Sequence, residues 1–176
     1  MLIGYSHAAV LVMLLILGGC AGSSPSTPPA AADTVETATI TQGAVPADMQ
    51  RQANRGDLDS QFQLGSWYFV RQPKDLKNAE YWWKQAADKG HALAAVSLAF
   101  LYTGRDNPAL NNPALMLKYL SQSAAGNNPM AQHVLGNFYL EGEHGVPKDA
   151  YQAHALFLSA CQQNYALSCA ALKQKP

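Results

Sequence analysis

The stretch from Asp75 to Ala99 reappears in outline 37 residues further along the chain, and again 74 residues after its first copy. Equivalent positions in the three copies carry chemically similar residues, and four columns of such positions stand out: Asp75/Asn112/Asp149, Gly90/Asn127/Asn164, Ala94/Ala131/Ser168 and Leu98/Leu135/Leu172. A repeat of this length indicates an architecture made by stacking one small structural unit on the next.

Each column has one physical role in a helix. Asp and Asn are strong N-caps, because a short side-chain oxygen accepts the unpaired backbone N–H groups of the first turn. Gly and Asn tolerate best the left-handed conformation that ends a helix. A small residue followed four positions later by leucine marks one buried helical face. Each copy is therefore predicted to hold one whole helix, its left-handed end and the start of the next helix.

Three further columns identify the first helix of each pair, called helix A here: Leu64/Leu98/Leu135, Gly65/Ala99/Gly136 and Tyr68/Tyr102/Tyr139. A loop rich in Pro or Gly follows each of them and leads to the second helix, helix B. We predict an all-α fold, an α/α superhelical solenoid of about three helix-pair repeats at about 57–90, 91–127 and 128–164. A half repeat at its N-terminal end and a terminal helix at 165–173 are expected to cap the domain of residues 46–173. The aromatic residues Trp67, Tyr81, Trp82 and Trp83 are expected in its core.

The pattern resembles the Sel-one-like repeat (SLR), a relative of the tetratricopeptide repeat. One half of the motif is Leu135-Gly136-x-x-Tyr139-x-x-Gly142 followed by Gly145-Val146-x-x-Asp149. The other half is Ala79-x-x-Trp82-Trp83-Lys84-x-Ala86-Ala87-x-x-Gly90. The first two loops between helices lack the Gly-Val element, which leaves loop shape open and does not affect the fold.

The resemblance implies that helix A of each repeat lines a concave face on which a protein or peptide partner lies. Carried over by position, the inward residues are Asp59, Phe62, Ser66 and Phe69; Leu93, Val96, Phe100 and Thr103; and Met130, His133, Asn137 and Leu140. This set is apolar with a few polar points, which suits an extended or helical peptide. The alternative is that its apolar members only pack between adjacent helices.

The first 19 residues are predicted to be a signal peptide. The uncharged run from Ala8 to Leu17 is too short to span a bilayer and has the length of a signal-peptide core. It ends in Leu17-Gly18-Gly19-Cys20, which resembles the lipobox of bacterial lipoproteins, and this implies a lipid such as palmitate on Cys20. An ordinary signal peptide cut elsewhere is the alternative. Ala21 after the cysteine favours the outer membrane, with the protein on its periplasmic face.

Residues 20–45 are rich in Pro, Ser, Thr, Ala and Gly and show no periodic pattern. Such a segment buries too little apolar surface to fold, so we predict a disordered tether. The chain carries 12 basic and 12 acidic residues, and this balance argues against nucleic acid as a partner.

Cys161 and Cys169 remain once Cys20 carries lipid. They fall on neighbouring antiparallel helices across a tight turn, and an even pair in an exported protein favours a disulfide. The spacing is similar to the bridges of cysteine-rich secreted SLR proteins. A redox or metal-binding pair is the alternative.

The sequence contains no HExxH, GxSxG, Walker, CxxC or S-x-x-K motif, and its histidines fall in different repeat columns. We therefore expect no enzyme activity, no metal and no cofactor. The predicted function is a scaffold or adaptor that binds an envelope protein or peptide. Two alternatives are an immunity protein that neutralises a secreted toxin such as a phospholipase effector, and a β-lactam or peptidoglycan-fragment hydrolase like that claimed for some SLR relatives.

Overall fold

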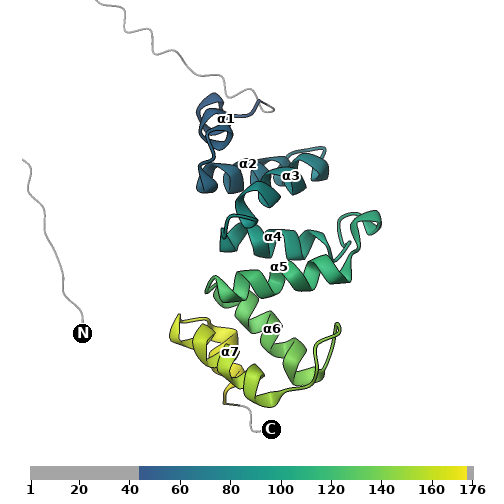
Figure 1. The fold of residues 1–176 in the computed structure, drawn as a ribbon, viewed down its shortest axis with the longest axis vertical. Helices are drawn as coiled ribbons and strands as arrows, with labels where there is room; N and C mark the ends of the chain where they lie inside the picture. The colour runs from purple at the N-terminus through teal and green to yellow at the C-terminus, as the bar shows by residue number, and fades with distance from the viewer. Residues whose placement is uncertain (1–43, 174–176) are drawn as a thin grey trace, which may run out of the picture. The chain divides into compact units, whose positions relative to one another are not determined.

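The computed structural model describes residues 44–173, and this part of the chain contains helices and no strands (Figure 1). The predicted signal peptide, Cys20 and nearly all of the predicted tether lie outside it. The elements in chain order are α1 (Ala47–Asn54), α2 (Leu58–Val70), α3 (Leu76–Ala87), α4 (Ala92–Leu101), the short 3-10 helix η1 (Pro108–Leu110), α5 (Pro113–Ala125), α6 (Pro129–Glu141), α7 (Ala150–Gln162) and α8 (Ala166–Ala171). None of the helices in this region has the length and apolar character to cross a membrane.

Successive helices pack on one another, so the all-α solenoid predicted from the repeats is confirmed. The three helix pairs are α2 with α3, α4 with α5, and α6 with α7, and these are the closest-packed neighbours. Helix α1 stands before the first pair as a lone helix B, and α8 follows the last pair as the start of a helix A. Because most contacts join neighbours in sequence, the packing at each joint decides local stability.

The start of helix B is built in the same way in every repeat. The side chains of Asp75, Asn112 and Asp149 accept backbone N–H groups from the first turns of α3, α5 and α7, as predicted. In addition, the backbone N–H of each cap residue donates to the carbonyl of a helix A tyrosine. The pairs are Asp75 with Tyr68 at 2.9 Å, Asn112 with Tyr102 at 2.9 Å, and Asp149 with Tyr139 at 2.7 Å. This shared anchor explains why a first connection three residues shorter than the others leaves the repeat geometry intact.

At each joint between repeats, one residue in the left-handed conformation ends the preceding helix. The φ angle is +96° at Gly90 and +65° at both Asn127 and Asn164, and Gly56 has the same conformation at +94° after α1. The next N–H along the chain then bonds back to a carbonyl in the last turn of the preceding helix, as from His91 to Ala86 at 3.1 Å. The half repeat at the N-terminal end therefore ends like a full one.

The core follows the predicted columns closely. Ala94, Ala131 and Ser168 have no exposed surface, and Leu98 and Leu135 are buried. Leu172 is the exception: it lies just after α8 and is half-buried, because no further helix covers this end within the described residues.

The prediction that four aromatic residues are core holds only for Trp83, which is 3% exposed. Trp67 and Trp82 are half-buried, and Tyr81 is 53% exposed. Tyr81 precedes Trp83 by two positions, a rotation of about 200° around the helix, so it points away when Trp83 points toward α2.

Cys161 and Cys169 are at disulfide distance, with 2.00 Å between sulfurs and 4.7 Å between Cα atoms. The bridge ties the C-terminal end of α7 to α8. It joins α8, the shortest α-helix in residues 44–173, to the helix on which it packs most closely.

Candidate functional site

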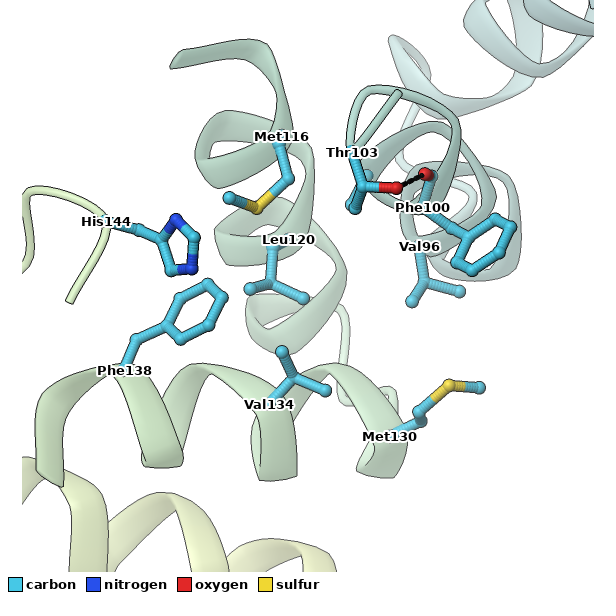
Figure 2. Close-up of a pocket in the computed structure, with 10 residues that line it drawn as sticks. Val96, Phe100, Thr103, Met116, Leu120, Met130, Val134, Phe138 and His144 are labelled. Carbon is cyan, nitrogen blue, oxygen red and sulfur yellow. Dashed lines mark hydrogen bonds between the residues drawn. The ribbon is translucent and has the colours of Figure 1, made fainter. Parts of the chain in front are cut away.

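An apolar groove of about 180 Å³ lies between α4 and α6, with α5 as its floor (Figure 2). Its lining comes from two helices A, one helix B and the loop after α6: Val96, Ala99, Phe100, Thr103, Met116, Leu120, Met130, Val134, Phe138 and His144. Two of its large side chains reach solvent, since Phe100 is 42% exposed and Met130 is 47% exposed.

The groove has few polar atoms. The Thr103 hydroxyl donates to the carbonyl of Phe100 at 2.7 Å, so its donor is already used. The His144 imidazole rests against the Phe138 ring, with 4.3 Å between ring centroids. Figure 2 shows that Val96, Leu120 and Val134, from α4, α5 and α6, point toward the same space. A surface of this kind has little to offer a charged ligand and favours an apolar group.

The groove lies where one helix B side chain of the middle repeat, Leu120, is smaller than the aromatic residue at the same position in the neighbouring repeats. In the other two repeats a glycine of helix A lies directly against an aromatic ring of helix B: Gly65 against Trp83, and Gly136 against Phe157. A Cβ at these glycines would lie 2.5 and 2.7 Å from the ring. The middle repeat has Ala99 and Leu120 at the same two positions, and both line the groove. The aromatic ring that fills this space in the first and third repeats is therefore absent from the middle repeat.

In the first repeat, several of the predicted partner-binding residues lie around the Trp83 ring. Its Nε1 donates to the carbonyl of Phe62 at 3.2 Å and to the Ser66 hydroxyl at 3.3 Å. The Phe69 ring packs on Trp83 at 5.3 Å, and Phe62 stacks on His91 at 5.0 Å. These side chains serve the packing of adjacent helices, which is the alternative to a partner-binding role.

Asp59 and Leu140 also lie apart from the groove. The Asp59 side chain is 81% exposed and accepts from Nε2 of His91 at 3.0 Å. Nδ1 of His91 accepts the backbone N–H of Ala94, so one imidazole both caps α4 and ties it to α2. Leu140 is half-buried near the end of α6.

In the third repeat, His133 on α6 faces α8, the last helix. Its Nδ1 lies 2.9 Å from the Ser168 hydroxyl, and the Asn137 amide lies 3.3 Å from its Nε2. The rings of Phe157 and Tyr165 flank it at 5.5 and 5.4 Å. Burial lowers the pKa of His133 below its ordinary value and so favours the neutral imidazole.

Of the predicted inward residues, the structure thus brings Val96, Phe100, Thr103 and Met130 together in one groove and leaves the others at the joints or on the surface. The sequence reasoning missed the helix B contribution of Met116 and Leu120, and the α6 face of Val134 and Phe138. One signal was available. The column Trp83/Leu120/Phe157 loses its aromatic ring in the middle repeat.

No three His, Cys, Asp or Glu side chains within residues 44–173 are grouped as a set of metal ligands. Ser168 and His133 resemble part of a nucleophile–base pair. Ser168, however, has no exposed surface, so its hydroxyl does not face a substrate.

The stacked helix pairs define the class, an α/α solenoid. The Sel1 repeat family model matches residues 58–91 and 129–165, so the chain contains Sel1 repeats in these two segments. The two matches cover the first and third helix pairs. They leave out the middle pair, whose Ala99 and Leu120 depart from the glycine–aromatic pattern. Sel1 repeats typically form scaffolds for protein–protein interaction.

Two solved structures are similar to this chain. A Sel1 repeat protein from Oxalobacter formigenes is 27% identical, with a TM-score of 0.64 over 72% of this chain and 95% of that one. A protective antigen of uropathogenic Escherichia coli strains, which displays an SLR fold, is 28% identical with a TM-score of 0.63 over 70% of this chain. The match spans 27% of the length of that antigen. A comparison with curated proteins found no match.

Proposed function

We propose that this protein is a non-catalytic docking module that holds a partner protein by an apolar side chain inserted into the groove between α4 and α6. One observation carries the proposal: the middle repeat lacks the ring that closes the equivalent space in its neighbours. The opening has an apolar lining and two exposed large side chains at its surface.

The size of the groove suits one side chain of the partner. An apolar cavity of about 150 Å³ is large enough to hold benzene, and this groove has about 180 Å³. Met116 and Met130 are unbranched and polarizable, so they adapt to side chains of different shape. A partner segment that places Leu, Met or Phe in the groove would bury Phe100 and Met130 as well. Such buried anchors commonly supply most of the binding free energy.

The proposal also includes an anchor. The sequence Leu17-Gly18-Gly19-Cys20 supports lipidation of Cys20, and Ala21 supports the outer membrane, with the protein facing the periplasm. Residues 20–45 would then supply reach between the lipid and the folded repeats. Metabolic labelling with a palmitate analogue tests this part. Label is expected on the intact chain and not on Cys20→Ser, and label that persists in the variant contradicts the anchor.

The main experiment fills the groove with the residues of the neighbouring repeats. In the double variant Ala99→Gly/Leu120→Phe, the middle repeat acquires the glycine–aromatic pair that the third repeat already has, so the solenoid is expected to stay folded. Crosslinked membranes are then used for pull-down with the wild type and the double variant. The variant is expected to lose the partner captured by the wild type.

Leu158→Phe is the matched control, because it makes the same substitution on α7 at a residue that is 43% exposed and outside the groove. It should retain the partner. Equal capture by the double variant would contradict the groove as the docking site. The identity of the captured protein separates an envelope partner from a secreted toxin, and nitrocefin turnover above that of His133→Ala would support a hydrolase instead.

A further inference from the structure

A second cavity, of about 310 Å³, lies at the joint between α1 and α2, which is called the first joint here. The middle joint is that between α3 and α4, and the third is that between α5 and α6. It is lined by the C-terminal end of α1, one residue of α2 and the outer face of α3: Ala53, Asn54, Arg55, Gly56, Gln61, Tyr81, Trp82, Gln85 and Lys89. In contrast to the groove, most of these side chains are polar. The equivalent positions at the other two joints show what is unusual about it.

Gln61, one of the residues that line this cavity, has an unused acceptor. Its side chain is buried at 3% exposed, and its Nε2 donates to the carbonyl of Ala53 at 3.0 Å. Its Oε1 is buried and has no hydrogen-bond partner among residues 44–173. Because a buried polar atom without a partner costs free energy, this oxygen calls for an N–H or O–H donor.

The third joint shows how the same glutamine is satisfied elsewhere. Gln132 occupies the position of Gln61 and donates in the same way, to the carbonyl of Ala124 at 3.3 Å. There, Oε1 of Gln132 accepts an amide N–H from Gln163 at 3.0 Å. Lys89 takes the position of Gln163 at the first joint, and it makes no hydrogen bond to Oε1 of Gln61. The donor that completes the third joint is therefore missing at the first.

Gln85 supplies a second free amide. Its counterpart at the middle joint, Gln122, donates to the carbonyl of Ala87. At the first joint the equivalent carbonyl, that of Ala53, is already taken by Gln61. Gln85 is thus left lining the cavity with both a donor and an acceptor, a combination that matches the N–H and C=O of a peptide backbone.

The charge at the cavity has one sign. Its lining includes Arg55 and Lys89 and no acidic residue. Neither of the two cations is in a salt bridge with another residue of the 44–173 region. Tyr81 and Trp82 form an aromatic wall in an edge-to-face pair at 5.0 Å, and Tyr81 is 53% exposed. Exposed aromatics next to cations and free amides indicate a binding surface for a ligand that is anionic and carries amide groups.

We infer that this cavity binds an acidic segment of a peptide. On binding, the Gln61 side chain shifts so that its Oε1 accepts a backbone N–H of the peptide. The Gln85 amide pairs with the peptide backbone, and a Glu or Asp side chain pairs with Lys89 or Arg55. Tyr81 and Trp82 cover the aliphatic part of the bound segment. The inference does not depend on the groove, and it adds a polar, charge-selective contact to the apolar one between α4 and α6.

The test uses the purified protein and two short peptides, acetylated and amidated. One alternates alanine with glutamate, and its partner has glutamine in place of each glutamate. Titration calorimetry should detect binding of the glutamate peptide and no binding of the glutamine peptide. The affinity for the glutamate peptide should fall as the salt concentration is raised. Lys89→Met and Gln85→Met should each weaken binding by about tenfold, the factor expected for losing one strong hydrogen bond.

Two control variants show whether the peptide binds in this cavity. Lys148→Met removes a positive charge from an exposed residue outside the cavity and should bind like the wild type. The groove-filled variant Ala99→Gly/Leu120→Phe should also bind the glutamate peptide normally, so failure of one proposal is distinguishable from failure of the other. Equal binding of both peptides, no binding at millimolar concentration, or a loss in Lys148→Met as large as in Lys89→Met would overturn the inference.

Discussion

Gly65 lies so close to Trp83 that a Cβ at residue 65 would be 2.5 Å from ring atom Cδ1. The same contact recurs between the third pair of helices, whereas the middle pair replaces both partners together. Glycine in a helix interior costs about 0.5–1 kcal/mol relative to alanine, so its presence needs a compensating contact. The ring that it admits supplies that contact and closes the joint.

This contact predicts a strong coupling between the two residues. Gly65→Ala should lower the free energy of unfolding by about 1–3 kcal/mol, because the added methyl forces the ring of Trp83 out of its place. In a Trp83→Leu background, which recreates the alanine–leucine pair of the middle repeat, the same substitution should cost much less. Urea unfolding of the four proteins in the cycle measures the difference.

The expected interaction between Gly65→Ala and Trp83→Leu is at least about 0.5 kcal/mol in favour of the double variant. Gly90→Ala is a useful comparison, since nothing lies within 4 Å of the Cβ that it would add and only its φ of +96° opposes it. Its cost should not depend on residue 83. Additive effects of Gly65→Ala and Trp83→Leu would contradict the close contact.

The repeat architecture could be predicted because its signals are local. Asp75 caps a helix and Gly90 ends one whatever the rest of the chain does, and their recurrence at a fixed interval reveals the stack. The columns do not predict which side of helix A is open to a partner, because they do not record how each helix pair packs on the next. Phe62 and His133 share a column with Val96. Each of them packs against the start of the helix that follows its own pair, whereas Val96 lines the groove.

The groove is a difference between repeats, whereas the columns record what the repeats share. It shows only when Leu120 is compared with the aromatic residues at the same position in the other helix pairs, together with Ala99 on the facing helix. The unpaired oxygen of Gln61 is a similar case. Gln132 has the same side chain in the same column, and the contact made by Gln163 gives its oxygen the donor that Gln61 lacks.

The cap at Asp75 should make stability depend on acid. Hydrogen bonds from the side chain and backbone of Asn78 hold the pKa of Asp75 below its ordinary value of 3.8. A carboxyl group with a lowered folded-state pKa stabilises the fold above its unfolded pKa and loses that effect as pH falls through the folded-state value. Asp75→Asn keeps a capping oxygen, as Asn112 does, so its stability relative to wild type should rise below about pH 4. Thermal unfolding between pH 7 and pH 2.5 measures this, and parallel curves for the two proteins would contradict it.

Loss of the cap itself is a separate effect. Asp75→Ala should lower the free energy of unfolding at pH 7 by about 1 kcal/mol, because the first turn of α3 loses its side-chain acceptor. Urea denaturation against wild type and Asp75→Asn measures it. An Ala variant as stable as the Asn variant would contradict a capping role.

His133 should make the fold sensitive to mildly acidic pH. Burial lowers its pKa below the ordinary value of 6.5, so the unfolded chain takes up this proton at a higher pH than the folded protein does. Stability is complete where the imidazole is neutral in both states, and it should decline as pH falls below about 6.5. His133→Gln keeps an amide that can reach Ser168 and has no titration, so its unfolding midpoint in urea should change less between pH 8 and pH 5. An equal decline in the two proteins would assign the effect to other groups.

The bridge between Cys161 and Cys169 should stabilise mainly the last helix. The two cysteines are 8 residues apart, and closing so short a loop is worth about 2–3 kcal/mol in the chain-entropy model. Helix α8 packs chiefly on α7, so loss of the bridge leaves it held by that short interface and by the bond between Ser168 and His133. In Cys161→Ala/Cys169→Ala, the amides of α8 should exchange with solvent much faster than in the oxidised wild type. Those of α2 and α3 should stay protected, because contacts in a solenoid run between neighbours. Hydrogen exchange resolved by helix distinguishes this local effect from global destabilisation, and unchanged protection of α8 would show that Ser168 and its bond to His133 suffice to hold the end of the stack.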